Sequence, residues 1–165
     1  MWNKVFEYFM EIKKTIGDNF TLNKPFKLLV EQYGTDEQKT RIEPLQLTQN
    51  GKFLLIRYGR YSNVFNGESE YEYADFWDMY DGFYKECRSL VIDLIEETIV
   101  LSPFKKFRNM NESDYDSFEN IEKRINVAKS IEITDKLDGS MQSARWYDSS
   151  VFMSGSQAID INTSW

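Results

Sequence analysis

The chain has 165 residues, of which 41% are hydrophobic and 16% aromatic, and its formal net charge is −7. This length and hydrophobic content predict one folded domain and exclude intrinsic disorder, which requires low hydrophobicity. The absence of histidine excludes histidine metal ligands and every histidine-based catalytic triad, and a single cysteine excludes an internal disulfide.

The charge and the apolar pattern also narrow the range of partners. An excess of acidic residues argues against non-specific coating of nucleic acid, but it is compatible with a local basic pocket. No apolar run has the length of a transmembrane helix, so no membrane partner is predicted. The lone Cys87 favours a reducing compartment such as the cytoplasm.

Two amphipathic helices are predicted at the start of the chain. The first covers residues 2–16 and ends at Gly17, and the second covers residues 25–33. Their apolar faces comprise Val5, Phe9, Ile12 and Ile16 in the first helix, and Phe26, Leu29 and Val30 in the second. Residues 34–51 are polar and rich in turn-forming residues, and they are predicted to be a connection.

The middle of the chain predicts a strand, a loop, a helix and a hairpin. The sequence GKFLLIRYGRY, residues 51–61, is typical of a buried strand. Residues 66–73 form an acidic loop, and residues 74–84 are predicted to form a short helix. Residues 88–94 and 98–102 are two apolar runs separated by a turn, which predicts a β-hairpin.

The remaining segment alternates between loops, one helix and strands. Residues 104–112 have no clear periodicity and are predicted to be a loop, and residues 113–126 to be an amphipathic helix. A strand at 129–135, a turn at 136–139 and a hairpin at 140–156 follow. The sequence therefore predicts the α+β class, with N-terminal helices followed by a mostly antiparallel sheet.

The clearest candidate for chemistry is the sequence Lys136-Leu137-Asp138-Gly139-Ser140. A lysine between a strand and a tight turn can point its amine into a pocket, where desolvation or nearby cations lower its pKa and make it a nucleophile. Asp138 places a carboxylate close to this amine, and Gly139 supplies the backbone freedom of the turn. The same pattern is common in surface hairpin turns, and for the motif alone that interpretation is favoured.

Two further segments contain candidate functional residues, and each also has a purely structural interpretation. Glu86-Cys87-Arg88 precedes a strand, and taken alone it predicts no more than a surface salt bridge. Residues 103–109, PFKKFRN, interleave three cations with two phenylalanines. Such a segment suits a polyanion, because cations bind phosphate and aromatic rings stack on bases. An equally favoured interpretation is a solvated loop whose phenylalanines enter the core.

Taken in order, the three segments resemble the phage-type RNA ligase 1 family of ATP-dependent RNA ligases, within the covalent nucleotidyltransferase superfamily. That family has Glu-Cys-Arg-Gly, then Pro-x-x-Lys-Phe-Phe-Asn, then Lys-x-Asp-Gly-Ser. This chain reads ECRS from Glu86, PFKKFRN from Pro103 and KLDGS from Lys136. The resemblance is strong over residues 86–143 and weaker over residues 54–65.

The resemblance implies an adenylyltransferase domain with ATP and Mg²⁺ as cofactors. Lys136 would attack the α-phosphate of ATP and hold AMP as a phosphoramidate. AMP would then pass to an RNA 5′-phosphate, and an RNA 3′-hydroxyl would seal the strand. The implied nucleotide-binding residues are Arg88, Lys106, Phe107, Thr134, Asp135, Asp138 and Gly139. The implied location is the cytoplasm of a bacterial or phage-infected cell, and no metal ligand is assigned.

The chain departs from the family pattern at several positions. Ser89 stands where glycine is usual, Ser102 where an arginine often precedes the proline, and Arg108 replaces the second phenylalanine. The sequence FMSGSQ, residues 152–157, has no lysine where the family has one near a Gly-Ser. We expect residues 1–165 to form one domain, a truncated N-terminal part of an adenylyltransferase domain that lacks the family's later elements. We therefore expect this chain to carry the nucleophile without the full catalytic apparatus.

Three alternatives remain beside the RNA ligase interpretation. A DNA ligase or capping enzyme would share the Lys-x-Asp-Gly motif, although the two preceding segments argue against it. A non-catalytic module that binds nucleotides or RNA ends is favoured by the acidic charge and the missing lysine. A plain α+β domain with a coincidental match would have to contain three ordered matches by chance.

Overall fold

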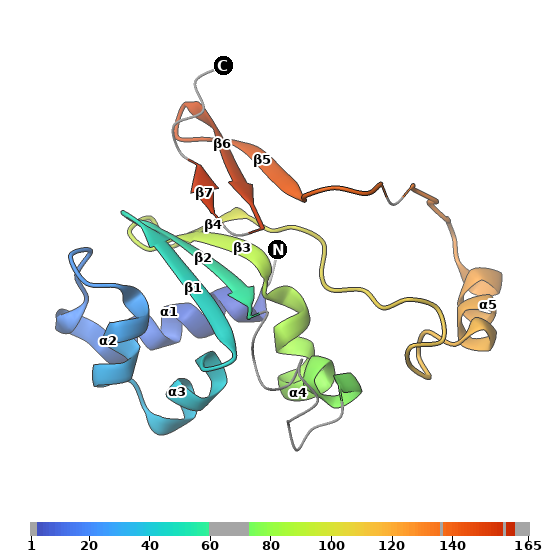
Figure 1. Ribbon diagram of the computed structural model, residues 1–165, viewed down its shortest axis with the longest axis horizontal. Helices are drawn as coiled ribbons and strands as arrows, with labels where there is room; N and C mark the ends of the chain where they lie inside the picture. The colour runs from blue at the N-terminus through green and yellow to red at the C-terminus, as the bar shows by residue number, and fades with distance from the viewer. Residues whose placement is uncertain (1–2, 60–72, 136, 157, 161–165) are drawn as a thin grey trace.

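The computed structural model describes residues 3–59, 73–135, 137–156 and 158–160 (Figure 1). Helices come first and antiparallel sheets follow, which confirms the predicted α+β class. The elements are α1 (Lys4–Ile16), the short 3₁₀ helix η1 (Gly17–Asn19), α2 (Phe26–Tyr33), α3 (Asp36–Ile42), β1 (Leu45–Asn50), β2 (Phe53–Tyr58), α4 (Tyr73–Glu86), β3 (Arg88–Asp93), β4 (Thr98–Leu101), α5 (Phe118–Val127), β5 (Gln142–Tyr147), β6 (Ser150–Gly155) and β7 (Ile159–Asp160).

Helices α1 and α2 lie where the apolar periodicity predicts them. The side chain of Asn3 caps α1 by accepting a hydrogen bond from the backbone N–H of Phe6. All the apolar residues predicted for the two helices are buried. No helix in the described part of the chain is long and apolar enough to cross a membrane.

The predicted connection at residues 34–51 is wrong, because α3 and β1 lie there. Thr35 and Gln38 form a reciprocal capping box that begins α3. This helix buries few residues, so its sequence has little apolar periodicity. Strand β1 is an outer strand and is only partly buried, which leaves it a polar composition.

The helix predicted at residues 74–84 is present as α4, but it is interrupted. The backbone is non-helical from Met79 to Gly82. Helix α4 continues to Glu86 and therefore leads directly into β3. The acidic loop predicted at residues 66–73 falls outside the described residues up to position 72.

The first sheet has the order β1-β2-β3-β4, and all of its neighbours are antiparallel. One face packs against the N-terminal helices through residues such as Leu90 and Ile92 of β3. Val91 points to the opposite face, because successive strand residues alternate. There it forms a second core with Phe152 and Ile159. Strand β3 is thus buried on both faces.

The second sheet has the order β5-β6-β7 and confirms the hairpin predicted at residues 140–156. It lies against the outer face of the first sheet (Figure 1). Two polar contacts accompany the apolar core. Arg145 Nη1 donates a hydrogen bond to the carbonyl of Ile99 at 2.9 Å, and the hydroxyl of Tyr147 donates one to Asp93 Oδ2 at 2.9 Å.

Between the two sheets the chain makes a long excursion through α5 (Figure 1). Helix α5 begins at Phe118 with Ser117 as its N-cap, later than predicted, because the preceding residues form turns held by Ser113 and Asp116. No residue of α5 is buried.

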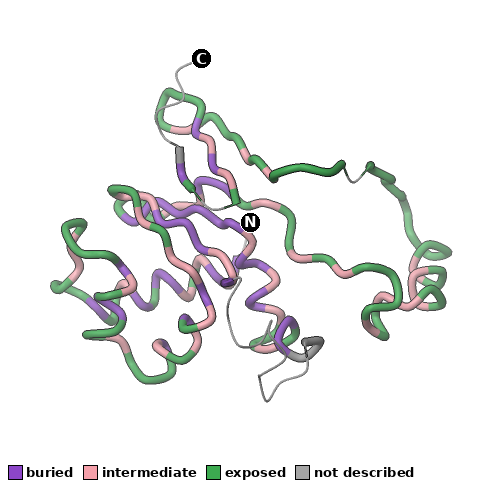
Figure 2. The backbone as a smooth tube through the Cα atoms, in the orientation of Figure 1, coloured by how far each residue is buried: buried purple, intermediate pink, exposed green. Residues whose placement is uncertain are grey.

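The strand predicted at residues 129–135 is wrong. The segment is exposed along its whole length (Figure 2), and Ile133 is among the most exposed apolar residues. An alternating sequence makes a strand only where a neighbouring strand satisfies its backbone groups. None of the described strands pairs with this segment.

Candidate functional site

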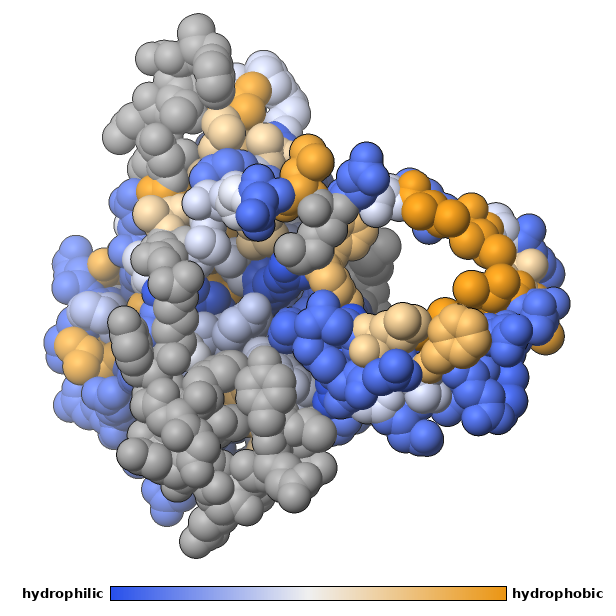
Figure 3. All heavy atoms as spheres, turned by 45° about the vertical axis from the view of Figure 1, so that its right-hand side comes forward, coloured by the Kyte–Doolittle hydropathy of each residue, from blue (hydrophilic) through white to orange (hydrophobic). Residues whose placement is uncertain are grey.

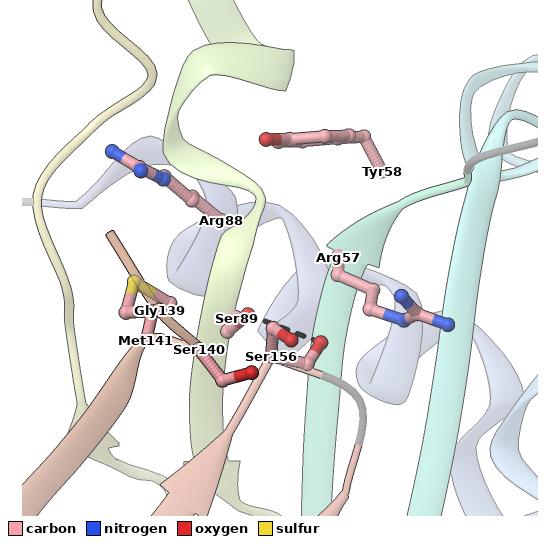
Figure 4. Close-up of a pocket in the computed structure, with 8 residues that line it drawn as sticks. All are labelled: Arg57, Tyr58, Arg88, Ser89, Gly139, Ser140, Met141 and Ser156. Atoms are coloured by element: carbon pink, nitrogen blue, oxygen red, sulfur yellow. Dashed lines mark hydrogen bonds between the residues drawn. The ribbon is translucent and has the colours of Figure 1, made fainter.

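A pocket of about 290 Å³ opens where the ends of the two sheets meet (Figure 4). It lies between the end of β2, the start of β3, the residues before β5 and the residue after β6. The residues that line it are Arg57, Tyr58, Arg88, Ser89, Gly139, Ser140, Met141 and Ser156. Two are arginines and three are serines, whereas no aspartate or glutamate of the described chain lines the pocket.

A β-bulge shapes one wall of this pocket. The register between β2 and β3 shifts next to Ser89, and the φ angle of Ser89 is +62°. Residues in this left-handed region of a bulge are usually glycines. Because the bulge interrupts the alternation of side chains, both Arg88 and Ser89 line the pocket. Ser89 Oγ donates a long hydrogen bond, 3.4 Å, to the carbonyl of Ser156.

Arg88 connects the first of the three sequence segments to the second. Its Nη1 donates a hydrogen bond to the carbonyl of Lys105 at 3.5 Å. Its guanidinium carbon lies 4.9 Å from the ring centre of Phe107, which is cation–π geometry. The residue therefore contacts segment 103–109 and lines the pocket at once.

Segment 103–109 is also held against α4. Lys105 Nζ lies 2.7 Å from Glu86 Oε1, and the Glu86 side chain is 5% exposed. The backbone N–H of Lys106 donates a hydrogen bond to the carbonyl of Lys85 at 2.7 Å. A salt bridge of Glu86 is thus present; the Glu86 side chain is buried, the Lys105 side chain is exposed, and the pair joins two of the three segments.

Arg108, which replaces the second phenylalanine of the family pattern, has an electrostatic role. Its Nη2 lies 3.0 Å from Asp78 Oδ2 on α4. Burial of Asp78 favours its neutral form, but hydrogen bonds from Lys85 and Arg108 outweigh this effect and hold the pKa of the carboxyl below its usual range. The replacement therefore adds an ion pair between the segment and α4.

The two phenylalanines of this segment do not enter the core, so that interpretation is wrong. Phe104 is 87% exposed and Phe107 is 50% exposed. Both line an open hollow of about 600 Å³ together with Lys105, Lys106 and Thr134. This hollow joins segment 103–109 to the residues just before position 136. Figure 3 shows the face on which the excursion lies, with an opening between it and the sheets.

The predicted site residues divide into four groups. Arg88 and Gly139 line the pocket, and Lys106, Phe107 and Thr134 line the hollow. Asp135 and Asp138 are exposed and line neither. Lys136 lies outside the described residues, so its predicted role as nucleophile stays a prediction.

Sequence reasoning missed Arg57 and Ser156 as pocket residues. The signal for Arg57 was its position as the only charged residue in the apolar run FLLIRY. Nothing in the sequence indicated that the register of β2 and β3 places it opposite Arg88.

The described residues contain no group of three or more cysteines, aspartates or glutamates that could hold a metal ion. A magnesium ion that arrives with a nucleotide needs only one or two carboxylates, because phosphate oxygens and water supply its other ligands. The exposed carboxylates of Asp135 and Asp138 fit this more limited requirement.

The part of the chain that contains the three segments is similar to a known protein family. Residues 86–164 match the model of a family described as RNA ligase. The match begins at Glu86 and includes all three sequence segments that meet around the pocket and the hollow. No curated protein and no solved structure matches the chain.

Proposed function

We propose, from the match of residues 86–164 to the phage-type RNA ligase 1 family, that the chain is the adenylyltransferase part of an ATP-dependent RNA ligase. Lys136 is the proposed nucleophile. Residues 1–165 form one functional unit in this proposal, with ATP and RNA ends as partners.

The observation that supports the proposal best is the convergence of three segments that are separated in sequence. Arg88 contacts the carbonyl of Lys105 and the ring of Phe107, and it shares a pocket with Gly139 and Ser140. A surface hairpin turn with an unrelated role has no reason to share a pocket with Arg88, which itself contacts the second segment. Convergence therefore favours a functional interpretation of the Lys-x-Asp-Gly turn.

The proposed reaction has three steps. The Lys136 amine attacks the α-phosphorus of ATP, an N–P bond forms, and the bond to the bridging oxygen breaks as pyrophosphate leaves with the electron pair and the amine loses a proton to solvent. An oxygen of the RNA 5′-phosphate then attacks the same phosphorus and breaks the N–P bond. Finally an RNA 3′-hydroxyl attacks the 5′-phosphorus, forms the phosphodiester and releases AMP.

Arg88 and Lys106 are the cations proposed to stabilise the charge that develops on the phosphates. Phe107 and Thr134 line the hollow beside Lys106 and are proposed to contact the nucleoside. Asp138 is proposed to orient the amine. Magnesium bound to the nucleotide would neutralise phosphate charge, with Asp135 or Asp138 as its protein ligand.

The experiment that tests the proposal is covalent labelling with α-³²P-ATP and magnesium, followed by denaturing electrophoresis. The wild-type chain should retain the label, and Lys136→Ala should not. Lys129→Ala is the matched control, because it removes an exposed lysine seven positions earlier and should leave the label unchanged. A labelled wild type whose label survives Lys136→Ala would refute the assignment of the nucleophile.

The nucleotide and the acceptor separate the related enzyme classes. ATP should label the chain and GTP should not, because GTP is the substrate of capping enzymes. A 5′-phosphorylated RNA should accept AMP from the labelled protein in preference to DNA of the same sequence.

One observation favours a second candidate, a non-catalytic module that binds nucleotides or RNA ends. Segment 129–135, which leads into Lys136, is exposed and pairs with none of the described strands. A nucleophile that is not held by a sheet loses the positional advantage on which covalent catalysis depends. For this candidate the labelling experiment gives no adduct, while equilibrium binding of ATP or RNA ends is retained.

A further inference from the structure

Phe104 stands at a position that the family pattern leaves open, yet it lines the same hollow as Lys106 and Phe107. We propose that Phe104 is a stacking platform for the 5′-terminal base of a single-stranded RNA. The inference deepens the proposed function and rests on it for the identity of the strand. The stacking surface itself does not depend on that function.

The first argument is the exposure of the Phe104 ring. Phe104 is 87% exposed, and it makes no aromatic or cation–π contact with any residue in the described part of the chain. Phe107, by contrast, is 50% exposed and has the guanidinium of Arg88 at 4.9 Å from its ring centre. A flat ligand can therefore cover the ring of Phe104 without displacing a protein side chain from it.

The second argument is the way in which the backbone beside Phe104 is held. Lys105 Nζ lies 2.7 Å from the buried Glu86 carboxylate, and the backbone N–H of Lys106 donates a hydrogen bond to the carbonyl of Lys85 at 2.7 Å. These two contacts fix the next two residues of the chain against the end of α4. An aromatic side chain on a fixed backbone has only two torsions left to order, so binding to it costs little conformational entropy.

The third argument is the cation that shares the hollow. Lys106 Nζ lies 5.7 Å from the ring centre of Trp77, and no carboxylate of the described chain forms an ion pair with it. Single-stranded nucleic acids are bound by this combination, in which a base stacks on an aromatic ring and a cation contacts the phosphate. In the proposed reaction the RNA 5′-phosphate must reach the phosphate of AMP, which brings the first base close to the same cation.

The overall charge of the chain favours stacking over electrostatic coating. The sequence has 27 acidic and 20 basic residues, so a broad basic surface is not available to attract the RNA backbone. Affinity for RNA must then come from a few contacts that do not depend on counterion release. Base stacking is such a contact, since every base has a π face.

The presence of two rings in one hollow favours an RNA base over the adenine of ATP as the ligand of Phe104. Phe107, which contacts Arg88, is the proposed partner of the ATP nucleoside. The second step of the proposed reaction requires an RNA end beside protein-bound AMP, and therefore a second base-binding surface next to the first. Phe104 lines the hollow but not the pocket of Arg88, and it supplies this surface.

The test compares Phe104→Ala, Phe104→Leu and Phe104→Trp in a Lys136→Ala background, so that no turnover occurs. Val127→Ala is the matched control, because Val127 is 81% exposed at the end of α5 and does not line the hollow. Circular dichroism reports whether each variant folds. Isothermal titration measures the affinity for ATP, for a 5′-phosphorylated RNA, and for the same RNA with an abasic first nucleotide.

The expected result is a loss of about 5- to 100-fold in affinity for the intact RNA with Phe104→Ala, the range for one stacked base. The abasic RNA should show the same loss with the parent protein, and Phe104→Ala should then add nothing. Phe104→Trp should retain the affinity, whereas Phe104→Leu, which lacks a π face, should behave as the alanine variant does. Val127→Ala should bind as the parent does. The slope of log K against log salt, about −0.7 for each phosphate contact, should be the same with and without Phe104.

Three results would overturn the inference. The first is an equal loss for intact and abasic RNA with Phe104→Ala, which shows that the ring does not contact the first base. The second is weaker binding of ATP with unchanged binding of RNA, which assigns the ring to adenine. The third is an affinity for intact RNA that does not change in Phe104→Ala or, if that variant does not fold, in Phe104→Leu.

Failure of this inference differs from failure of the proposed function. Normal labelling of Lys136 in the wild type, with RNA binding that does not depend on Phe104, overturns the inference alone. No labelling of the wild type, together with a loss at Phe104 that requires the first base, would refute the ligase proposal and support the stacking platform.

Discussion

The bulge at Ser89 provides a direct test of the pocket's geometry. Replacing Ser89 by glycine or by alanine removes the hydroxyl and its 3.4 Å hydrogen bond to Ser156 in both cases. The two variants therefore differ only in the Cβ atom. At a φ of +62° a Cβ atom costs about 1–2 kcal/mol, because it approaches the following carbonyl oxygen.

The magnitude follows from two opposing effects. Glycine relieves the strain of about 1–2 kcal/mol, but its freer unfolded chain costs about 0.5–1 kcal/mol. Ser89→Gly should therefore be more stable than Ser89→Ala by about 0.5–1 kcal/mol. For a chain of this size the difference corresponds to about 1–4 °C in Tm.

The assay is urea and thermal unfolding followed by far-UV circular dichroism, with Ser154 as the control position. Ser154 is also buried, lies in β6 and does not have a positive φ. At an ordinary strand position glycine is the destabilising residue, so Ser154→Ala should be more stable than Ser154→Gly by about 0.5–1 kcal/mol. The sign should thus reverse between the two positions.

The contradicting result would be that Ser89→Ala is as stable as Ser89→Gly while the Ser154 pair behaves as expected. Such a result would mean that Ser89 does not occupy the left-handed conformation in solution. The explanation of how Arg88 and Ser89 both come to line the pocket would then have to be abandoned.

Three further predictions concern stability. Lys105→Ala should destabilise the fold by about 1–3 kcal/mol, because it leaves the buried Glu86 carboxylate without its ion-pair partner. In a Glu86→Gln background, Lys105→Ala should cost less, because no buried charge is left unpaired. A double-mutant cycle in urea measures this coupling, and additive effects of the two substitutions would contradict it. Burial raises the pKa of Asp93, but hydrogen bonds from the Glu96 backbone, Lys52, the Ile95 backbone and Tyr147 outweigh burial and lower it. The Asp93 carboxylate therefore stabilises the fold fully above the ordinary carboxyl pKa of about 3.9, and this stabilisation disappears as pH falls through the lowered value. Asp93→Asn should therefore flatten the acid side of a plot of Tm against pH, and an unchanged slope would refute the assignment. Phe152→Ala should lower the free energy of unfolding by about 3–5 kcal/mol, because Phe152 packs between the sheets. Phe104→Ala should lower it by less than about 0.5 kcal/mol, because Phe104 is exposed. Similar losses for the two variants in chemical denaturation would refute this difference.

Local patterns predicted the elements whose burial is strongly periodic. Helix α1 and the β3–β4 hairpin follow from apolar spacing alone, because one face or both faces of each element lie in a core. Helix α3 was missed because a capping box, and not an apolar stripe, defines it. The strand predicted at residues 129–135 was wrong because strand formation depends on a partner, and partners are not encoded locally.

In the candidate site, too, local motifs predicted some residues, whereas others depend on contacts between distant parts of the chain. The sequence singled out Arg88, Lys106 and Gly139 from motifs, and the structure brings their segments together. Arg57 could not be found in this way, because its place opposite Arg88 depends on the register between strands 31 positions apart in the chain. Nor does the sequence reveal that Arg108 pairs with Asp78, since the two residues are 30 positions apart and come together only in the folded chain.

Strand β3 forms the wall between two hydrophobic cores, with Leu90 and Ile92 on one side and Val91 on the other. Neither core can open without exposing this strand to water, so its amide hydrogens should exchange with solvent only when the whole molecule unfolds. The amides of α5, which buries no residue, should exchange through local fraying that leaves both cores intact. The pocket begins at Arg88, the first residue of β3, and one of its walls is therefore continuous with the part of the molecule that is expected to exchange most slowly.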